Sequence, residues 1–583
     1  MSADEKPSVD PGELQGRINR LIARYKETYS SESLDELFEV LLIASANLPD
    51  RAYVLSQLSA VRLARFRIRG DAADLAGAVE SARSSLALTA PGQTLDRLTR
   101  QLNLGAALLE VASRSGAAEL TEAAELLREA SEGFSAGSEE HALALANLCD
   151  GLRLLAKRTG DPQYLVDAVA AGEEAVAALS SSSGERSAIL TNCANALRTH
   201  ANRTATWSSL DSAIQYHRRA ISEALVEDPR RPGYADDFAI SLYNRFELRG
   251  ESNDLDEAIE VLERAVNESP RDNPNLGSRL TNLSVTLRLR FENFGDVKSL
   301  SRAREKAREA VAATPRYDEK LPGRLSNLAS ILLEFFGVSG EHSILEEGVG
   351  AFRQALDLLP GGHSLRPVIL TNLANALRSR AYALGQPDDL TEAFSFGKDA
   401  LLSVAPGDPL IGNCSYNLAM ILQAAYSVSS EHKFLDAAID LVRATAMNSS
   451  IPIVIRLTAA QAWGEWAGQE ISEDRAYLRQ AVEGYAAAVS LLPTLAWRGL
   501  LRTSQERALA GQSNLPGLAA AYAAEARLAE GAVAILELGR SVLWRQLIDI
   551  RTDLEELRKR DSNLAHRMIF VRCSWTNCQW TEA

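Results

Sequence analysis

Cysteine and histidine side chains near the C-terminal end of the chain are the first residues to consider for chemistry. His566 and Cys573 lie close together in the sequence, and a thiolate within reach of an imidazole is what a cysteine nucleophile needs. Cys573 and Cys578 have the spacing of half of a zinc site. A second half is missing, so the sequence predicts no bound metal and no cofactor.

Asparagine recurs at a regular interval along most of the chain. The stretches AILTNCANALRTHA at 188–201 and VILTNLANALRSRA at 368–381 are identical at ten of fourteen positions and begin 180 residues apart. Their fifth residue recurs, mostly at intervals of 45 residues, as Asn103, Asn147, Asn192, Asn282, Asn327, Asn372 and Asn417. Gln57 and Asp237 fill the two remaining places. Such a period indicates a repeat architecture.

A series of leucines marks the second half of each period. Leucines recur every 45 residues from Leu75 to Leu435, and Leu478 follows. A small residue stands three positions after each, and in most periods an alanine stands ten positions after. These offsets share one face of a helix, and short side chains there allow a neighbouring helix to approach closely. Cysteines at first-helix core positions, Cys149 and Cys193, are expected to be buried reduced thiols.

Each period therefore contains two helices. Glycines such as Gly70 and Gly385 separate the first helix from the second. Capping residues just before the leucine, Asp74 and Asp254 among them, predict where the second helix begins. Prolines fifteen positions after the leucine predict where it ends, at Pro270, Pro315, Pro360 and Pro493.

No single helix pair buries its apolar face alone, so successive pairs must stack. The predicted fold class is an all-α superhelical solenoid of about ten to eleven helix pairs with a 45-residue period, followed by further helices. The eleventh is a degenerate pair around Leu34.

The residues of the second helix resemble those of tetratricopeptide repeats: a small residue, another seven later, and Pro five after that. The stretch TNLANAL at 371–377 is similar to the first helix of the same family. The period itself fits HEAT or armadillo repeats better.

This resemblance implies a role for the asparagines. In tetratricopeptide domains that bind extended peptides, Asn at the matching position points into the concave groove, where its amide bonds to a peptide backbone. The candidate groove residues are Asn192, Asn282, Asn327, Asn372 and Asn417. The alternative is that each amide bonds to the adjacent repeat and sets the stacking, and both roles can coexist.

Three arginines follow their Asn by six residues and belong to the same candidate surface: Arg198, Arg288 and Arg378. A cationic groove would select acidic peptides or C-terminal carboxylates. The alternative is that these side chains pack along helix edges.

The pattern NLAxxL, then Gly, then DLxxAI looks like the repeats that precede a CHAT domain, the caspase-like peptidase module of bacterial and fungal proteins. LELGRSVLWRQLIDIRTDLEELR at 536–558 is similar to the segment joining such repeats to that module, notably at Gly539, Arg540, Trp544, Gln546 and Arg551. The expected organisation is a disordered tail (1–12), the tetratricopeptide-like solenoid (13–493), a C-terminal helical segment resembling the CHAT-preceding linker (494–567) and an irregular tail (568–583).

The CHAT module would bring a catalytic His in a His-Gly context and a nucleophilic Cys. After His566, however, the chain reads RMIFVRCSWTNCQWTEA, and neither His566 nor Cys573 lies in such a motif. We therefore expect no catalytic residue and no enzymatic activity. The alternative is a truncated gene product of a caspase-like cysteine peptidase whose catalytic module lies downstream.

Composition limits the classes of partner that the chain is expected to bind. The net charge of −15 and the lack of a basic run disfavour nucleic acid. No signal peptide and no run of eighteen apolar residues is present, so no membrane segment is expected. Five scattered cysteines make no disulfide framework, which favours the cytoplasm.

The predicted function is a non-enzymatic scaffold that binds a protein or peptide partner in its concave groove, as the sensing part of a CHAT-type protein. A scaffold for assembly without a regulatory role is a further alternative, and the oligomeric state stays open.

Overall fold

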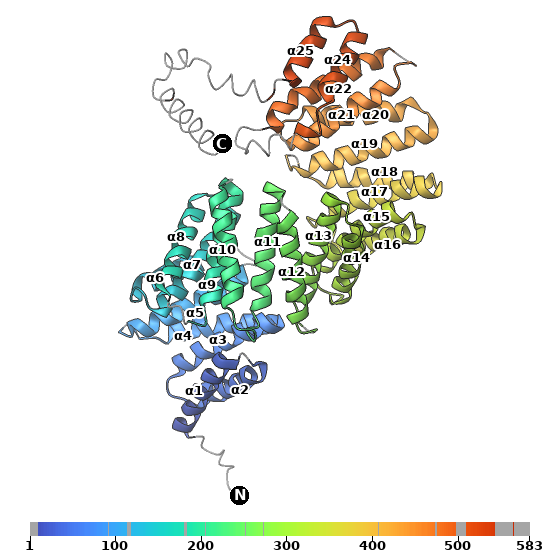
Figure 1. The fold of residues 1–583 in the computed structure, drawn as a ribbon. Helices are drawn as coiled ribbons and strands as arrows, with labels where there is room; N and C mark the ends of the chain where they lie inside the picture. Colours follow the sequence, from blue (N-terminus) through green and yellow to red (C-terminus); the bar gives the residue numbers. More distant parts are fainter. Residues whose placement is uncertain are drawn as a thin grey trace. The chain divides into compact units, whose positions relative to one another are not determined.

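A computed structural model describes residues 10–28, 30–90, 92–112, 118–179, 183–204, 206–250, 252–271, 273–405, 407–472, 475–496, 509–540, 542 and 564. Within these residues every regular element is an α-helix (Figure 1). The chain divides into two units, Met1–Asn327 and Leu328–Ala583.

The first unit contains α1 (Pro11–Thr28), α2 (Ser31–Asn47), α3 (Arg51–Arg69), α4 (Ala72–Ala87), α5 (Thr94–Ala112), α6 (Ala118–Gly133), α7 (Glu139–Thr159), α8 (Gln163–Ala178), α9 (Arg186–Thr204), α10 (Trp207–Glu223), α11 (Arg231–Arg249), α12 (Ser252–Glu268), α13 (Leu276–Phe294), α14 (Val297–Ala312) and the start of α15 (Leu321–Ser339). The second contains the rest of α15, α16 (His342–Asp357), α17 (Arg366–Leu384), α18 (Asp388–Ser403), α19 (Leu410–Ser429), α20 (His432–Met447), α21 (Ile453–Gln469), α22 (Ala476–Leu495), α24 (Leu515–Glu525) and α25 (Ala529–Arg540).

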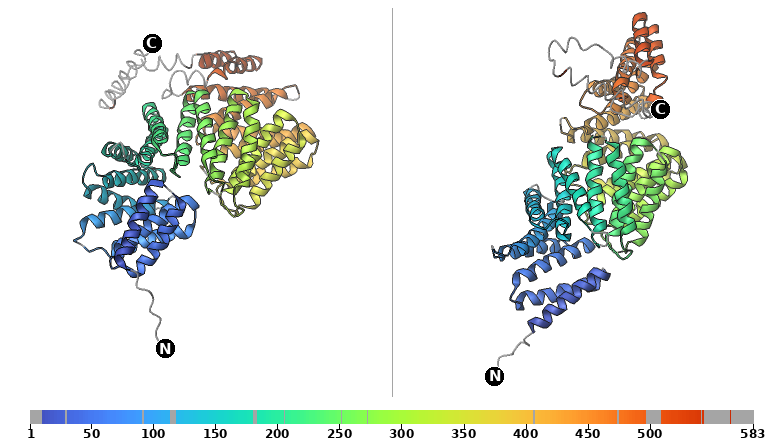
Figure 2. Two further views of the ribbon diagram at one scale, coloured as in Figure 1. Left: turned by 60° about the horizontal axis from the view of Figure 1, so that its bottom comes forward. Right: turned by 60° about the vertical axis from the view of Figure 1, so that its left-hand side comes forward.

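Consecutive helices pack in pairs, and each pair corresponds to one predicted repeat (Figures 1 and 2). The helix α3 packs against α4, and the pairing recurs from α5–α6 to α13–α14 and from α17–α18 to α21–α22. In the second unit, Gly348 of α16 lies against Leu333 of α15. The earlier pair α1–α2 contains Leu34, and α24–α25 follows the last full repeat. The predicted all-α solenoid of tetratricopeptide-like helix pairs is confirmed.

The periodic leucines and small residues form the core between the helices. Leu255 and Leu300 are fully buried, as are the small residues Ala258 and Ala303 three positions after them. This packing follows from spacing alone, because positions 0, 3 and 10 of a helix share one face. The core positions predicted from the sequence are confirmed.

Glycine ends the first helix in most repeats. Gly70 and Gly385 have φ of 73° and 63°, in the left-handed region that closes a helix without steric cost for glycine. After α19 the equivalent residue is Ser430, which adopts φ of 58°.

The predicted start of the second helix is wrong by about three residues. The α4 helix begins after Asp71, whose side chain accepts a hydrogen bond from the Ala73 N–H, and α14 begins after Asp296 in the same way. Asp74, which the sequence suggested as the cap, is instead a buried carboxylate inside the first turn.

An arginine of the first helix holds such buried carboxylates. Arg245 of α11 bonds to Asp254 of α12 at 2.6 Å and to Asp211 of the preceding second helix at 3.2 Å. One guanidinium thereby joins three helices of two repeats. Equivalent arginines in other repeats also join acidic residues of two helices: Arg65, Arg290 and Arg380.

Proline closes three second helices as predicted but not the last. The helices α12, α14 and α16 end before Pro270, Pro315 and Pro360. Pro493 lies inside α22, which continues to Leu495, so its predicted role as a helix stop is wrong.

The predicted tail 568–583 lies outside the described residues, as do much of the predicted segment 494–567 and residues 1–9 of the predicted disordered tail. These boundaries stay predictions. Across the described ranges, no helix is both long enough and apolar enough to cross a membrane.

Candidate peptide-binding surface

The first helices of the repeats line the inner side of each unit. Consecutive first helices touch one another directly from α3 through α13 in the first unit and from α17 through α21 in the second. Among second helices of the described residues, only α20 and α22 make comparable contact. In a stack of helix pairs, the layer whose helices lie closer together has the smaller radius. The first-helix face is therefore the concave one in each unit.

All three predicted groove asparagines of the first unit donate hydrogen bonds to the preceding repeat, two of them to neutral acceptors. The Asn192 Nδ2 donates to the Ala146 carbonyl oxygen at 3.2 Å. The Asn327 Nδ2 donates to the Ser284 Oγ at 2.9 Å. Both side chains are half-buried on the concave face. These amides join successive first helices, which is the geometry that a stacking role requires.

The asparagines of the second unit differ from one another. The Asn417 Nδ2 donates to the Asn413 carbonyl oxygen at 2.8 Å within its own helix, and its Oδ1 accepts from Asn375 Nδ2 at 2.6 Å. Asn372 is half-buried, and no hydrogen bond to its amide is found among the described residues. The asparagine series is therefore regular in sequence but not in bonding.

Two of the three predicted arginines bond within the chain. The Arg198 Nη2 donates to the Asn195 Oδ1 at 2.9 Å, and burial lowers the pKa of Arg198. The Arg288 Nε lies 3.3 Å from the Glu292 Oε1, one turn further along α13. Both contacts fit the alternative that these side chains serve the repeat stack itself.

Arg378 of α17 has a different environment. Its side chain is half-buried, and this burial lowers its pKa. The neighbouring phenols of Tyr382 and Tyr416 act in the opposite direction and partly raise the pKa. No carboxylate lies within ion-pair distance of Arg378 in the part of the chain that the structure describes. Tyr382 is 51% exposed, and Tyr416 is half-buried. A partly desolvated guanidinium without an internal anion is a strong site for an external carboxylate.

Two adjacent carboxylates of α11 were missed as candidate residues. Asp237 accepts a hydrogen bond from the Asn195 Nδ2 of α9 at 2.9 Å, and burial raises its pKa. Asp236 faces α13, where its Oδ2 lies 3.2 Å from the Arg279 Nε and its Oδ1 lies 3.5 Å from the Asn282 Nδ2. The predicted groove residue Asn282 is thus engaged with the preceding repeat.

Burial shifts the pKa values of both Asp236 and its partner Arg279. Burial raises the pKa of Asp236 to about 7, although Arg279 and Asn282 favour its charged form. Burial likewise lowers the pKa of Arg279, whose side chain is 4% exposed. Both shifts have one cause, because each charge loses more hydration than its partner restores. The sequence did carry a signal for these two carboxylates, because Asp237 interrupts the asparagine series.

His217 of α10 is a buried imidazole at the core position of its repeat. It is 0% exposed, and burial together with the nearby Arg198 charge lowers its pKa to about 3. The ring packs 6.3 Å from the ring of Phe238. It is therefore a neutral core residue at physiological pH. Among the described residues, no cluster of His, Cys, Asp and Glu has the arrangement of a metal site.

The cysteines of the repeats are buried. Cys149, Cys193 and Cys414 are free thiols. Burial raises the pKa of Cys193 to about 12, so its thiolate form is scarce at neutral pH. His566, Cys573 and Cys578 lie outside the described residues.

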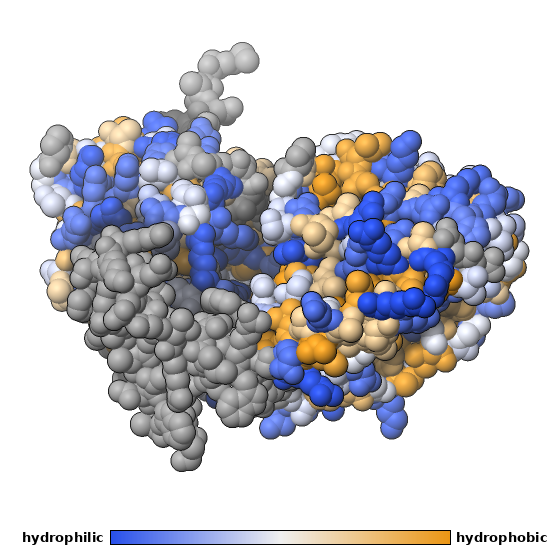
Figure 3. Space-filling model, turned by 90° about the horizontal axis from the view of Figure 1, so that it is seen from above, coloured by the Kyte–Doolittle hydropathy of each residue, from blue (hydrophilic) through white to orange (hydrophobic). Residues whose placement is uncertain are grey.

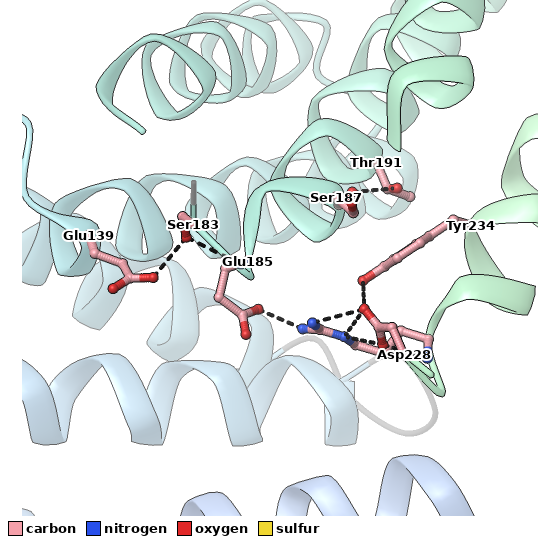
Figure 4. A network of polar contacts seen from close by, with 8 residues as sticks. Glu139, Ser183, Glu185, Ser187, Thr191, Asp228 and Tyr234 are labelled. Atoms are coloured by element: carbon pink, nitrogen blue, oxygen red, sulfur yellow. Dashed lines mark hydrogen bonds and ion pairs between the residues drawn. The ribbon is translucent and has the colours of Figure 1, made fainter. Parts of the chain in front are cut away.

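The loops between repeats of the first unit carry a polar network (Figure 4). Ser183 donates to the Glu139 carboxylate at 2.8 Å. The Arg230 guanidinium bonds to Glu185 at 2.5 Å and to Asp228 at 3.0 Å. The network connects the segments before three successive first helices. Its one cation, Arg230, bonds to two carboxylates inside the repeat stack, which indicates a structural role.

Comparisons with known proteins give structural neighbours alone. No protein-family model matches the sequence, and no curated protein matches it. The apo form of the quorum sensor NprR from B. thuringiensis has a TM-score of 0.40 and 12% identity, covering 74% of this chain and 99% of that one. The human IFIT1 dimer with PPP-AAAA has a TM-score of 0.34 and 12% identity, covering 88% and 95%. BtubC from P. vanneervenii has a TM-score of 0.29 and 15% identity, covering 43% and 94%.

Proposed function

We propose that this chain is a non-enzymatic interaction scaffold that binds a protein partner through an extended peptide segment on the first-helix face. The observation that carries the proposal is Arg378, a half-buried cation with no carboxylate partner among the described residues. An acidic side chain or a C-terminal carboxylate of the peptide would supply the missing anion.

The neighbours of Arg378 suit a peptide. Tyr382 and Tyr416 offer aromatic surface with a polar tip, which is common where proteins bind one another. The Asn372 amide lies on the same helix and can donate to and accept from a peptide backbone. On the face drawn in Figure 3, hydrophobic residues lie interspersed with hydrophilic ones. We therefore propose a polar, charge-guided groove rather than one large apolar patch.

A protein partner is favoured over nucleic acid. The chain has 77 acidic and 62 basic residues, which gives a net charge of −15. Such a chain repels a phosphate backbone along most of its surface. One cationic point inside an acidic molecule selects a short anionic segment instead.

Display of peptides with free C-termini tests the proposal. The full chain should enrich peptides that end in, or contain, acidic residues, and their affinity should fall as salt is raised. Arg378→Gln should abolish the enrichment. The matched control is Arg443→Gln, which removes an exposed guanidinium of the same unit that pairs with Asp440. Failure to enrich any peptide, or equal enrichment with Arg378→Gln, would contradict the proposal.

We further propose that the solenoid is the sensing part of a CHAT-type protein. The support is the resemblance of the repeats and of residues 536–558, of which 536–540 and 542 are described, to the segment that precedes that module. Reading the native transcript beyond the codon for Arg567 tests it. An open frame that encodes a His-Gly motif and a nucleophilic Cys would identify the solenoid as the regulatory half of a peptidase. A transcript that ends as printed would leave a stand-alone binding protein.

A further inference from the structure

A cavity in the second unit lies apart from the first-helix face of α17 and α19. It opens between the start of α22 and the turn that joins α24 to α25, and its volume is about 460 Å³. Pockets for small molecules commonly span about 300–1,000 Å³. Its lining residues are Arg475, Leu478, Arg479, Glu525, Ala526, Arg527 and Leu528.

The lining is cationic, with three solvent-exposed arginines against one carboxylate. Arg475 and Arg479 are four residues apart at the start of α22, so both side chains lie on one side of the helix. Arg527 comes from the turn between α24 and α25. Among the described residues, neither Arg475 nor Arg527 forms an ion pair. Arg479 lies 3.1 Å from Glu483, but both side chains are largely exposed, so this pair holds the arginine weakly.

The three arginines lie near helix amino ends, where the helix dipole disfavours positive charge. Arg475 and Arg479 flank the amino end of α22, and Arg527 precedes the amino end of α25. The dipole of a helix makes its amino end partly positive, so cations there repel it. Arg527 also has φ of 60°, a conformation that side chains other than glycine adopt at a cost. An anion in the cavity would relieve the repulsion at both helix ends.

We propose that this cavity binds a phosphoryl group or a similar multivalent oxyanion carried on a larger molecule. The planar fork of a guanidinium matches two oxygens of such a group at once, and three of them can surround it. The cavity exceeds the size of a single phosphate, and Leu478 and Leu528 offer apolar contact to the molecule that carries the group. That molecule is either a small phosphorylated compound or a phosphorylated side chain of a partner protein.

Calorimetric titration of the full chain at low ionic strength tests the site and its source. The probes are pyrophosphate and a short phosphoserine peptide, with the unphosphorylated peptide as a blank. Saturable binding of pyrophosphate alone identifies a small phosphorylated compound, whereas binding of the phosphoserine peptide alone identifies a partner's side chain. Binding of both supports the oxyanion site for either source.

Two variants assign the binding to the cavity. Arg475→Gln with Arg479→Gln should weaken binding at least about tenfold, because two of the three charged hydrogen-bond donors are lost. Arg527→Gly should also weaken it while the fold is kept, because glycine accepts the φ of 60° without strain. The matched control is Lys433→Gln with Arg443→Gln, which removes two exposed charges of α20 and should change affinity by less than about twofold.

Two results would overturn the proposal. Neither probe binds saturably to the wild-type chain, or the cavity variants bind as tightly as the control. Glu473 and Asp474 precede Arg475 in the sequence and lie outside the described residues.

Discussion

Glu263 of α12 pairs with Arg302 of α14, and this pair reverses the charges that the same two positions carry elsewhere. The first position lies eight residues after the periodic leucine, and the second lies two residues after the next leucine. In other repeats the arginine comes first and the glutamate second, as in Arg83–Glu122, Arg218–Glu257 and Arg353–Glu392. Both charges are exchanged together in this repeat. The stack therefore requires an attractive pair between neighbouring second helices, but it does not require a positive charge at one particular position of the pair.

This relationship predicts the result of a charge exchange. Glu263→Arg alone would place two cations together and should lower the unfolding free energy by about 1 kcal/mol. Adding Arg302→Glu restores an attractive pair in the order that other repeats use, and it should recover most of that loss. Urea denaturation at low salt measures both variants.

High salt provides the control for the charge exchange. The side chains of Glu263 and Arg302 are 38% and 45% exposed, so about 1 M salt should erase most of the difference between the variants. A double variant as unstable as Glu263→Arg would show that these positions act through packing and not through charge.

Asp236 predicts that the first unit gains stability as the pH falls. Its pKa is about 7 in the folded chain, and it returns to its ordinary value near 4 on unfolding. Between these values the folded state holds a proton that the unfolded state lacks. This contribution is complete below about pH 4 and is lost as the pH rises through about 7, with a slope of at most about 1.4 kcal/mol per pH unit.

The comparison between wild type and Asp236→Asn isolates this contribution. The asparagine cannot ionise, so the unfolding free energy of the variant relative to wild type should improve from pH 5 to about pH 7 and level off above it. Arg279 and Asn282 remain in both proteins and stay in one protonation state over this range, so the change with pH reports Asp236 together with its coupling to the adjacent Asp237. A difference that does not change with pH would mean that Asp236 is ionised throughout the range.

The core was predictable because its signal is periodic. Ala258 and Ala303 were assigned to the helix contact from spacing, and both are fully buried. The start of the second helix was not predictable in the same way, because Asp71 and Asp74 are equally good capping residues in sequence. Only the position of Arg65 on the neighbouring helix makes Asp74 a buried partner instead.

The candidate surface was predictable in its residues but not in their bonding. The Asn192, Asn327 and Asn372 positions are equivalent by period. The acceptors of Asn192 and Asn327 lie about one repeat away, so the stagger between neighbouring first helices decides which amides find an acceptor. That stagger depends on side-chain packing across the interface, which spacing does not report.

A close approach between the backbones of two helices predicts opposite effects for two Gly→Ala substitutions. A Cβ on Gly484 of α22 would lie 2.5 Å from the backbone nitrogen of Gly464 in α21, so the helices must separate. Gly484→Ala should therefore cost about 1–3 kcal/mol of unfolding free energy. Gly350 of α16 has no neighbouring atom at its Cβ position, so Gly350→Ala should stabilise by about 0.5–1 kcal/mol.

Thermal denaturation of the two glycine variants, followed by circular dichroism, provides the measurement. Both substitutions are chemically identical and lie within helices of the same unit. Stabilisation by Gly484→Ala would mean that α21 and α22 do not approach as closely as described. A loss of stability in Gly350→Ala would reveal a neighbour at that surface.

Two asparagines of the series should respond differently to the same change. Asn327 donates to the buried Ser284 hydroxyl, so Asn327→Ala should lower the unfolding free energy by about 0.5–1.5 kcal/mol. Asn372 has no hydrogen bond among the described residues, and it shares α17 with Arg378. Asn372→Ala should leave stability within about 0.5 kcal/mol and weaken the binding of an acidic peptide selected on the wild-type chain.

Melting and peptide affinity, measured on both variants, separate the two roles of the series. The expected result assigns Asn327 to the stacking of repeats and Asn372 to the groove, because an amide already bonded across the stack has less to offer a ligand. Equal losses of stability in the two variants, with unchanged affinity per folded molecule, would assign the whole series to stacking. In that case Arg378 would hold the carboxylate of the peptide without help from the Asn372 amide.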